Sequence, residues 1–171
     1  SDESRFIPVA QNMANGHFPE DPSEWFGTRL VLLAPVALLF RIFGASDLTV
    51  AIWPLVCSLL AVVVAYLLGR DLADRRIGLI AAGLVAVAPI EARLGMFLRP
   101  DAIVPAFVGL AVWCALRAGR SDRRTVWWAL AAGVSLGCGW SARENAIMLV
   151  PVIIAAGWPR VRTAVLPGIA G

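Results

Sequence analysis

Three pairs of ionisable residues stand beside apolar runs, and their side-chain types suit group-transfer chemistry. The pairs are Asp2 with Glu3, Arg99 with Asp101, and Arg143 with Glu144. A carboxylate in a pocket can act as general base toward a hydroxyl or an amine when burial and a cationic neighbour tune its acidity. Arginine presents a planar fork that matches phosphate, so Arg99 or Arg143 could hold a phosphorylated leaving group.

His17 is the only histidine, and it lies in a Gly-His-Phe-Pro segment. A metal site needs several ligands, and although Asp2, Glu3 and Glu20 are candidate neighbours, no spacing motif joins them to His17. We therefore expect His17 to be solvated or to line a substrate site. No cofactor is assigned, and a divalent metal is left as an open alternative. Phosphate-loop, dinucleotide, zinc-protease and nucleophile-elbow motifs are absent from the sequence, so nucleotide-sugar chemistry and hydrolase triads have no support.

The elements that must position these residues are apolar runs separated by charged loops. Hydrophobic residues make up 59% of the chain and charged residues only 16%, whereas a soluble domain has about 25% charged residues. The pattern predicts an all-α fold, a polytopic transmembrane helical bundle. The expected spans are residues 48–69, 77–92, 101–117, 125–142 and 145–159.

Only the first of these runs is long enough to cross the membrane without question, because a span needs about 20 residues. Two interpretations of the shorter runs compete: helices whose ends lie in a protein-lined aqueous cavity, or buried helices of a soluble bundle. We favour the first, because no run shows the amphipathic stripe of a surface helix.

Residues 1–47 are expected to form an outer loop with short interfacial helices. One short helix is predicted around Phe6 to Met13. The apolar stretch 28–44 is interrupted by Pro35 and Arg41, which favours an interfacial or partly inserted helix over a full span. Asp47 is placed to cap the next helix. We treat 1–171 as one membrane domain and expect it to be a piece of a longer protein, inactive in isolation.

The basic residues fix the orientation, because all 15 Lys and Arg residues are arginine. The arginine-rich loops alternate with loops that hold only Arg93 and Arg99, or Arg143 alone. Arginine-rich loops are cytoplasmic by the positive-inside rule. The rich loops contain Arg70, Arg75 and Arg76, then Arg117, Arg120, Arg123 and Arg124, then Arg160 and Arg162.

All three ionisable pairs then fall on the outer face. A single pair at a membrane end could equally well be a snorkelling or capping pair, but three on one face favour a site. The net charge of +3 indicates contact of cytoplasmic loops with membrane lipids and gives no reason to expect nucleic acid. Cys57, Cys114 and Cys138 are interpreted as small core residues.

The outer ionisable pairs and the short motifs between them, taken in their order along the chain, resemble those of the polytopic GT-C glycosyltransferases. The resemblance is to the dolichyl-phosphate-mannose protein mannosyltransferase and aminoarabinose transferase relatives in particular. The resemblance covers nearly the whole chain and depends on the order and shared outer placement of its motifs. The motifs are Asp2-Glu3, Phe43-Gly44-Ala45-Ser46, Tyr66-Leu67-Leu68-Gly69-Arg70, Ala81-Ala82-Gly83, Ala88-Pro89, Arg99-Pro100-Asp101 and Ser141-Ala142-Arg143-Glu144-Asn145.

The resemblance implies transfer of a sugar from a polyprenyl-phosphate donor to a lipid, glycan or protein acceptor on the non-cytoplasmic face. It implies Asp2 as the acceptor-activating base or its close partner, with Glu3 beside it and Asp101 lining the same pocket. Arg99 and Arg143 would face the carrier phosphate, and Glu144 and His17 are added to the substrate-binding set. The expected location is the plasma membrane of a prokaryote.

Two alternatives from other classes are kept. A transporter or flippase subunit would carry ionisable residues near the bilayer midplane and broken helices in matching halves. A non-catalytic membrane scaffold would carry the outer acids only as solvated loop charges.

Overall fold

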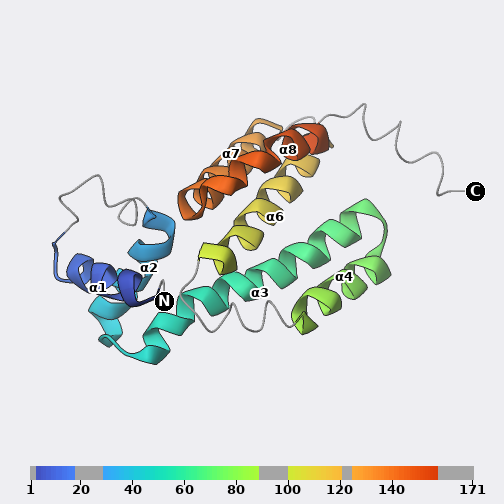
Figure 1. The fold of residues 1–171 in the computed structure, drawn as a ribbon. Coiled ribbons are helices and arrows are strands. Elements are labelled where there is room, and N and C mark those ends of the chain that lie inside the picture. Colours follow the sequence, from blue (N-terminus) through green and yellow to red (C-terminus); the bar gives the residue numbers. More distant parts are fainter. Residues whose placement is uncertain (1–2, 18–28, 89–99, 121–124, 158–171) are drawn as a thin grey trace, which may run out of the picture.

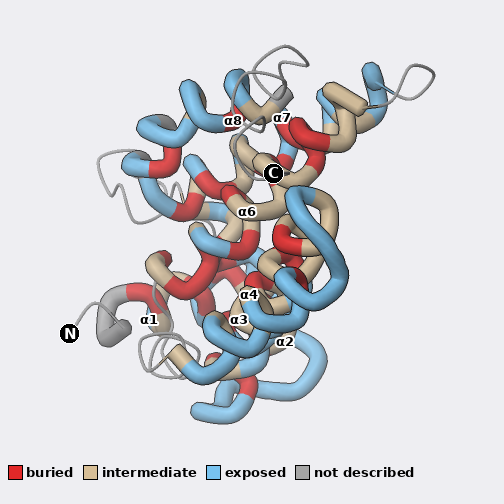
Figure 2. The backbone as a smooth tube through the Cα atoms, turned by 90° about the vertical axis from the view of Figure 1, so that its right-hand side faces the viewer, coloured by how far each residue is buried: buried red, intermediate tan, exposed pale blue. Residues whose placement is uncertain are grey.

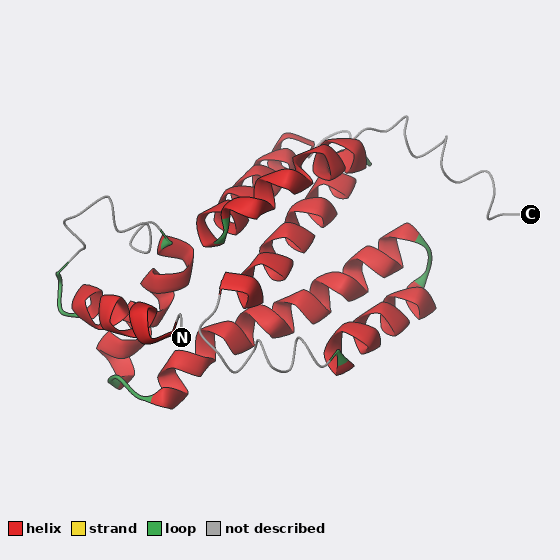
Figure 3. Ribbon diagram, viewed as in Figure 1, coloured by secondary structure: helices red, strands yellow, loops and turns green. Residues whose placement is uncertain are grey.

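The structure, a computed structural model, describes residues 3–17, 29–88, 100–120 and 125–157. Every regular element in these ranges is a helix and none is a strand (Figures 1 and 3), which confirms the all-α prediction. The elements are α1 (Glu3–Ala14), α2 (Leu30–Phe43), α3 (Asp47–Leu72), α4 (Arg75–Val87), α6 (Pro100–Ala118), α7 (Thr125–Ala142), the 3₁₀ helix η2 (Glu144–Leu149) and α8 (Val150–Gly157).

Two of the described helices, α3 and α6, are long and apolar enough to cross a membrane. With 26 and 19 residues they extend about 39 and about 28 Å at 1.5 Å per residue. The 13 residues of α4 extend only about 20 Å. The expected span over 77–92 runs beyond the described residues, and the division of the chain into five spans stays a prediction.

Helix α6 lies between α3 on one side and α7 with α8 on the other, while α4 packs back against α3 (Figure 1). Small residues permit these approaches. A Cβ atom on Gly69 of α3 would lie 2.8 Å from the Cα of Gly78 in α4. A Cβ on Gly109 of α6 would lie 2.8 Å from a methyl carbon of Val64 in α3. The α3–α4 and α3–α6 contacts therefore depend on glycine at these positions.

The largest apolar cluster lies at the end of the bundle where α3 and α6 begin. It joins Phe6 of α1 and Leu33 of α2 with Val50 of α3, Ile103 of α6 and Ala142 of α7. The outward faces of the helices are also rich in apolar side chains, such as Leu48 at 80% exposure, and Figure 2 shows long exposed stretches between the buried turns. An apolar exterior of this extent fits contact with lipid.

The start of α3 differs from the expectation. Ser46, not Asp47, is the N-cap: the backbone N–H of Thr49 donates to Ser46 Oγ, and Thr49 Oγ1 accepts from the backbone N–H of Ser46 at 2.9 Å. This reciprocal pair satisfies two otherwise unbonded N–H groups. Asp47 instead lies in the first turn, where its charge complements the helix dipole.

The proline inside α2 is compensated by a tryptophan of α3. Pro35 has no N–H, so it leaves the carbonyl of Val31, four residues earlier, without its helical partner. The indole N–H of Trp53 donates to that oxygen at 3.0 Å. The segment 1–47, expected to form an outer loop with interfacial helices, is therefore held to α3 by a specific hydrogen bond from Trp53 to α2 as well as by apolar packing.

Residues 144–157 form two elements, where a single helix over 145–159 was expected. The 3₁₀ helix η2 is followed by α8, whose second residue is Pro151. Proline is tolerated in a first helical turn but cannot donate to a carbonyl of a preceding turn. A continuous α-helix through this position is therefore disfavoured.

Candidate functional site

One ion pair joins two of the residues singled out from the sequence. Arg143 Nη1 contacts Asp101 Oδ1. Asp101 lies in the first turn of α6, and Arg143 directly follows the last residue of α7. Because α6 and α7 are antiparallel neighbours, the start of one helix meets the end of the other, and the pair closes this end of the α6–α7 hairpin.

Both side chains remain accessible. The Arg143 side chain is 45% exposed and the Asp101 side chain 41% exposed. An ion pair this open contributes only about 0–1 kcal/mol to stability. Arg143 engages a single nitrogen in the pair, and no other described residue bonds to its remaining donors. The pair therefore holds a carboxylate and a guanidinium at one place while leaving both able to meet a ligand.

Helix α1 is anchored at the same end of the bundle. Phe6 and Ala10 of α1 are fully buried in the cluster that also contains Ile103 and Ala142. Ile103 is two residues after Asp101, and Ala142 immediately precedes Arg143. The cluster thus places α1, which packs chiefly against α2, at the same end of the bundle as the Asp101–Arg143 pair.

The structure describes the other predicted site residues only in part. Asp2 and Arg99 lie outside the described residues, and only the backbone positions of Glu3 and Glu144 are described. His17 is exposed and follows α1, at the opposite end from Glu3 of a helix that is about 18 Å long at 1.5 Å per residue. Within the described ranges, no three His, Cys, Asp or Glu side chains gather in a way that could hold a metal ion.

A model of the dolichyl-phosphate-mannose-protein mannosyltransferase family matches residues 30–166, a range that includes both Asp101 and Arg143. The chain belongs to this family. The match confirms the resemblance drawn from the sequence motifs. Together with the two long apolar helices, family membership identifies a membrane protein.

Relatives of this family member carry a more specific name. The chain is 30% identical over 162 residues to the undecaprenyl phosphate-alpha-4-amino-4-deoxy-L-arabinose arabinosyl transferase of Pseudomonas paraeruginosa. It is equally similar to the proteins of that name from two Pseudomonas aeruginosa strains. Each alignment covers 90% of this chain and 29% of the relative. The chain therefore spans less than a third of the length of the relatives it matches. No solved structure gives a significant match.

A second charged cluster, missed in the sequence, lies at the other end of α6 in this member of the mannosyltransferase family. Asp71, near the end of α3, accepts hydrogen bonds from Trp113 Nε1 at 2.9 Å and from Arg117 Nε at 2.8 Å. Arg70 Nε donates to the same carboxylate at 3.3 Å. The spacing of Trp113 and Arg117, four residues apart on one helix face, was the available signal.

The same cluster fixes which helix ends lie together. Asp71 lies in the last turn of α3 and Arg117 in the last turn of α6. Because the two side chains meet, these two helices end on the same side of the bundle. The segments that follow them are two of the arginine-rich loops, and Asp101 and Arg143 are at the opposite end. The alternation of rich and poor loops along the sequence thus corresponds to two opposite ends of the described helices.

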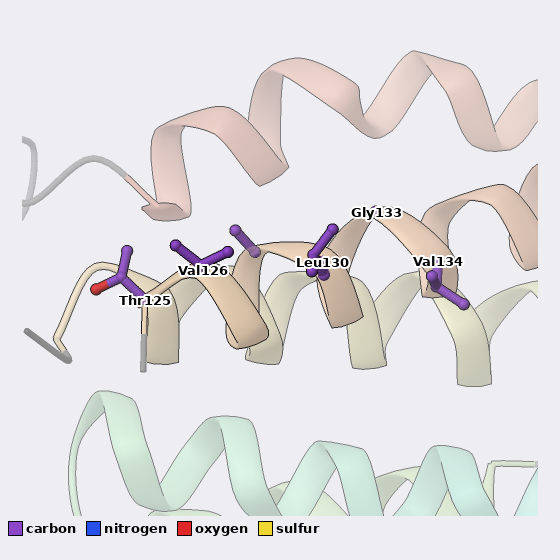
Figure 4. Close-up of a pocket in the computed structure, with 6 residues that line it drawn as sticks. Thr125, Val126, Leu130, Gly133 and Val134 are labelled. Carbon is purple, nitrogen blue, oxygen red and sulfur yellow. The ribbon is translucent and has the colours of Figure 1, made fainter. Parts of the chain in front are cut away.

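An apolar hollow on the side of α7 that faces away from the rest of the bundle is separate from both charged clusters. It is lined by side chains of that helix from Thr125 through Val126 and Leu130 to Val134 (Figure 4). This is the first half of α7, whereas Arg143 follows its last residue. The hollow has no charged lining residue, so we do not connect it with the chemistry of Asp101 and Arg143.

Proposed function

We propose that the protein containing this chain transfers a sugar from a polyprenyl-phosphate carrier to an acceptor on the non-cytoplasmic face of the membrane. Family membership and the names of the Pseudomonas relatives support the reaction class. The acceptor, whether lipid, glycan or protein, is left open. Since the chain spans 29% of those relatives, the activity belongs to the full-length protein.

The observation that carries the proposal is the Asp101–Arg143 ion pair. It places a carboxylate beside a planar cation at an accessible helix end, in the part of the bundle opposite the arginine-rich loops. A glycosyl phosphate donor and a nucleophilic acceptor need these two kinds of group, one to accept a proton and one to bind phosphate.

In the proposed reaction an acceptor hydroxyl oxygen attacks the anomeric carbon of the donor, and the bond between that carbon and the phosphate oxygen breaks. The carrier phosphate leaves with the electron pair, and a carboxylate takes the acceptor proton. We assign proton transfer to Asp2, with Glu3 beside it, place Asp101 in the same pocket, and assign phosphate binding to Arg143 and Arg99.

The expected location is the plasma membrane of a prokaryote, with the site on its outer face. Within the described helices, every charged residue of α2, α3, α4, α6 and α7 lies in a first or last turn. Charged residues in the middle of spans, as the transporter alternative would require, are not found in these helices. This distribution favours the transferase.

The test compares single variants of the full-length protein in isolated membranes supplied with a polyprenyl-phosphate sugar. Asp101→Asn and Arg143→Gln should each lower sugar transfer at least about 100-fold, the size of effect typical for loss of a positioned charged group at a reacting centre. Arg143→Gln should act mainly by raising the donor concentration needed for half-maximal rate.

Matched controls are Asp47→Asn and Arg41→Gln, which remove the same charges from exposed positions at the same end of the bundle. Both should transfer sugar at the wild-type rate. Wild-type transfer by Asp101→Asn and Arg143→Gln, in protein that inserts and melts normally, would exclude the proposed site.

A further inference from the structure

In the orientation proposed above, the cytoplasmic end of the described helices carries more positive charge than the described acids there can balance. Five arginines gather around the ends of α3 and α6 and the start of α4, against two aspartates. Both aspartates are occupied by donors of the chain itself: Asp74 Oδ1 accepts from the backbone N–H of Ile77 at 2.8 Å, and Asp71 is held as described above. The five are Arg70, Arg75, Arg76, Arg117 and Arg120.

Asp71 contacts three guanidinium groups and holds them near one another. Its side chain is only 9% exposed, and its carboxylate binds Arg70 and Arg117 while its backbone carbonyl oxygen accepts from Arg120 Nη2. Arg120 Nη1 also lies 4.0 Å from the carboxylate, so one residue with a single negative charge holds three positive charges close together. We call Asp71 with these three arginines the Asp71 clamp.

The clamp leaves donors directed away from its own acid. Arg70 uses only Nε toward Asp71, and Arg117 uses Nε and Nη2, so the remaining guanidinium nitrogens of these two residues have no hydrogen bond to any described residue. The side chains are 36% and 35% exposed. Like charges held together in this way repel one another, and a second anion would relieve that repulsion.

We infer that the Asp71 clamp binds the phosphate of an anionic phospholipid headgroup. Phosphate matches the arginine fork and accepts several N–H bonds at once. The clamp lies at the end of α3, a helix long enough to span a membrane. The end of a spanning helix is at the depth of the lipid headgroups. Basic pockets between helices on the cytoplasmic side are known to bind anionic headgroups.

Apolar surface beside the clamp suits the lipid tails. Val63, two helical turns before Arg70 along α3, is 51% exposed, and Ile80 of α4 is 58% exposed. The ring of Tyr66 lies under Arg70, 5.7 Å from its guanidinium carbon, as expected for an interfacial aromatic residue. A headgroup at Arg70 and Arg117 with its tails along these side chains would thus have both polar and apolar partners.

The experiment measures which lipids stay bound to the purified full-length protein by native mass spectrometry. The protein is placed in mixed micelles that contain equal amounts of phosphatidylglycerol and phosphatidylethanolamine with the same acyl chains. The wild-type protein should retain phosphatidylglycerol in preference. Arg70→Gln should lower this preference about fivefold, the contribution of one arginine at an anionic surface. Arg41→Gln removes the same charge from the last turn of α2, which precedes the start of α3, and should leave the preference unchanged.

Arg117→Lys is a second variant that keeps the charge near Asp71 but loses the planar fork, and it should lower the preference by a smaller factor than Arg70→Gln. The inference is overturned if the wild-type protein shows no preference, or if Arg70→Gln keeps the full preference while melting as the wild type does. It is also overturned if millimolar inorganic phosphate displaces the retained lipid completely, because the clamp would then be a site for a free anion. None of these outcomes depends on sugar transfer.

Discussion

Asp101 at the start of α6 and Arg143 just beyond the end of α7 form an ion pair at the open end of the α6–α7 hairpin. Both side chains are more than 40% exposed, so the pair contributes little to folding, about 0–1 kcal/mol. Its position at the end of the bundle opposite the Asp71 clamp therefore has more bearing on ligand binding than on stability.

The exchanged double variant Asp101→Arg/Arg143→Asp separates a structural role from a functional one. If the pair only tied α6 to α7, exchanging the two charges would restore whatever the single variants lose. We expect sugar transfer to stay as low as in the single variants, because the acceptor and the phosphate would meet the wrong charges. Transfer assays and thermal melting of the full-length protein measure the two effects; regained transfer would limit the pair to a structural contact.

Trp53→Phe should destabilise the protein through a carbonyl group of another helix. Removing the indole N–H leaves Val31 O without the donor that replaces the one Pro35 lacks. Loss of a partner for a partly buried carbonyl lowers the free energy of unfolding by about 1–3 kcal/mol. The midpoint of thermal unfolding in detergent would report the change, and Trp127→Phe, at a position 74% exposed, is the matched control.

Pro35→Ala should suppress the effect of Trp53→Phe. Alanine restores an N–H group that can bond to Val31 O within α2, so the indole donor is no longer needed. In the double-mutant cycle the loss caused by Trp53→Phe should be smaller in the Pro35→Ala background than in the wild type. Strictly additive effects would show that the hydrogen bond does not compensate for the proline.

Gly78→Ala should disrupt the α3–α4 hairpin. A Cβ at this position would lie 2.7 Å from the carbonyl oxygen of Tyr66, a backbone atom that cannot move without shifting α3. The same substitution at Gly83, where nothing lies within 4 Å of the added carbon, should stabilise α4 by up to about 1 kcal/mol because alanine favours helix. Opposite shifts in melting temperature are expected, and equal shifts would contradict the close packing of the two helices.

Asp71→Asn should lower the free energy of unfolding, whereas Asp74→Asn should leave it almost unchanged. Asparagine caps a helix as well as aspartate does, so the change at Asp74 should leave stability almost unaltered. At Asp71 it removes the charge that Arg70 and Arg117 share, and we expect a loss of about 1–3 kcal/mol, reduced by the ability of the exposed arginines to turn toward water. Melting of both variants at neutral pH, in detergent without added lipid, makes the comparison.

The sequence alone was sufficient for the fold class and the family. Apolar runs and charged loops are local patterns, and they predicted an all-α fold that the described residues confirm. The ordered motifs from Phe43-Gly44-Ala45-Ser46 to Arg143-Glu144-Asn145 indicated the family that the comparison then established. Sequence reasoning did less well at helix boundaries: it chose Asp47 over Ser46 as a cap and overlooked the effect of Pro151.

The sequence also named Asp101 and Arg143 as candidates, but it could not show that they meet, because each belongs to a different helix end. The tertiary structure decided that contact, and with it the Asp71 clamp and the Trp53–Val31 hydrogen bond. The Asp101–Arg143 contact and the Asp71 clamp depend on how closely α3, α6 and α7 approach, and Gly109 and Gly139, which face a neighbouring helix, permit that approach. Helix formation follows from neighbours along the chain, whereas the meeting of helix ends follows from packing between segments far apart in the sequence, and only the folded arrangement contains that information.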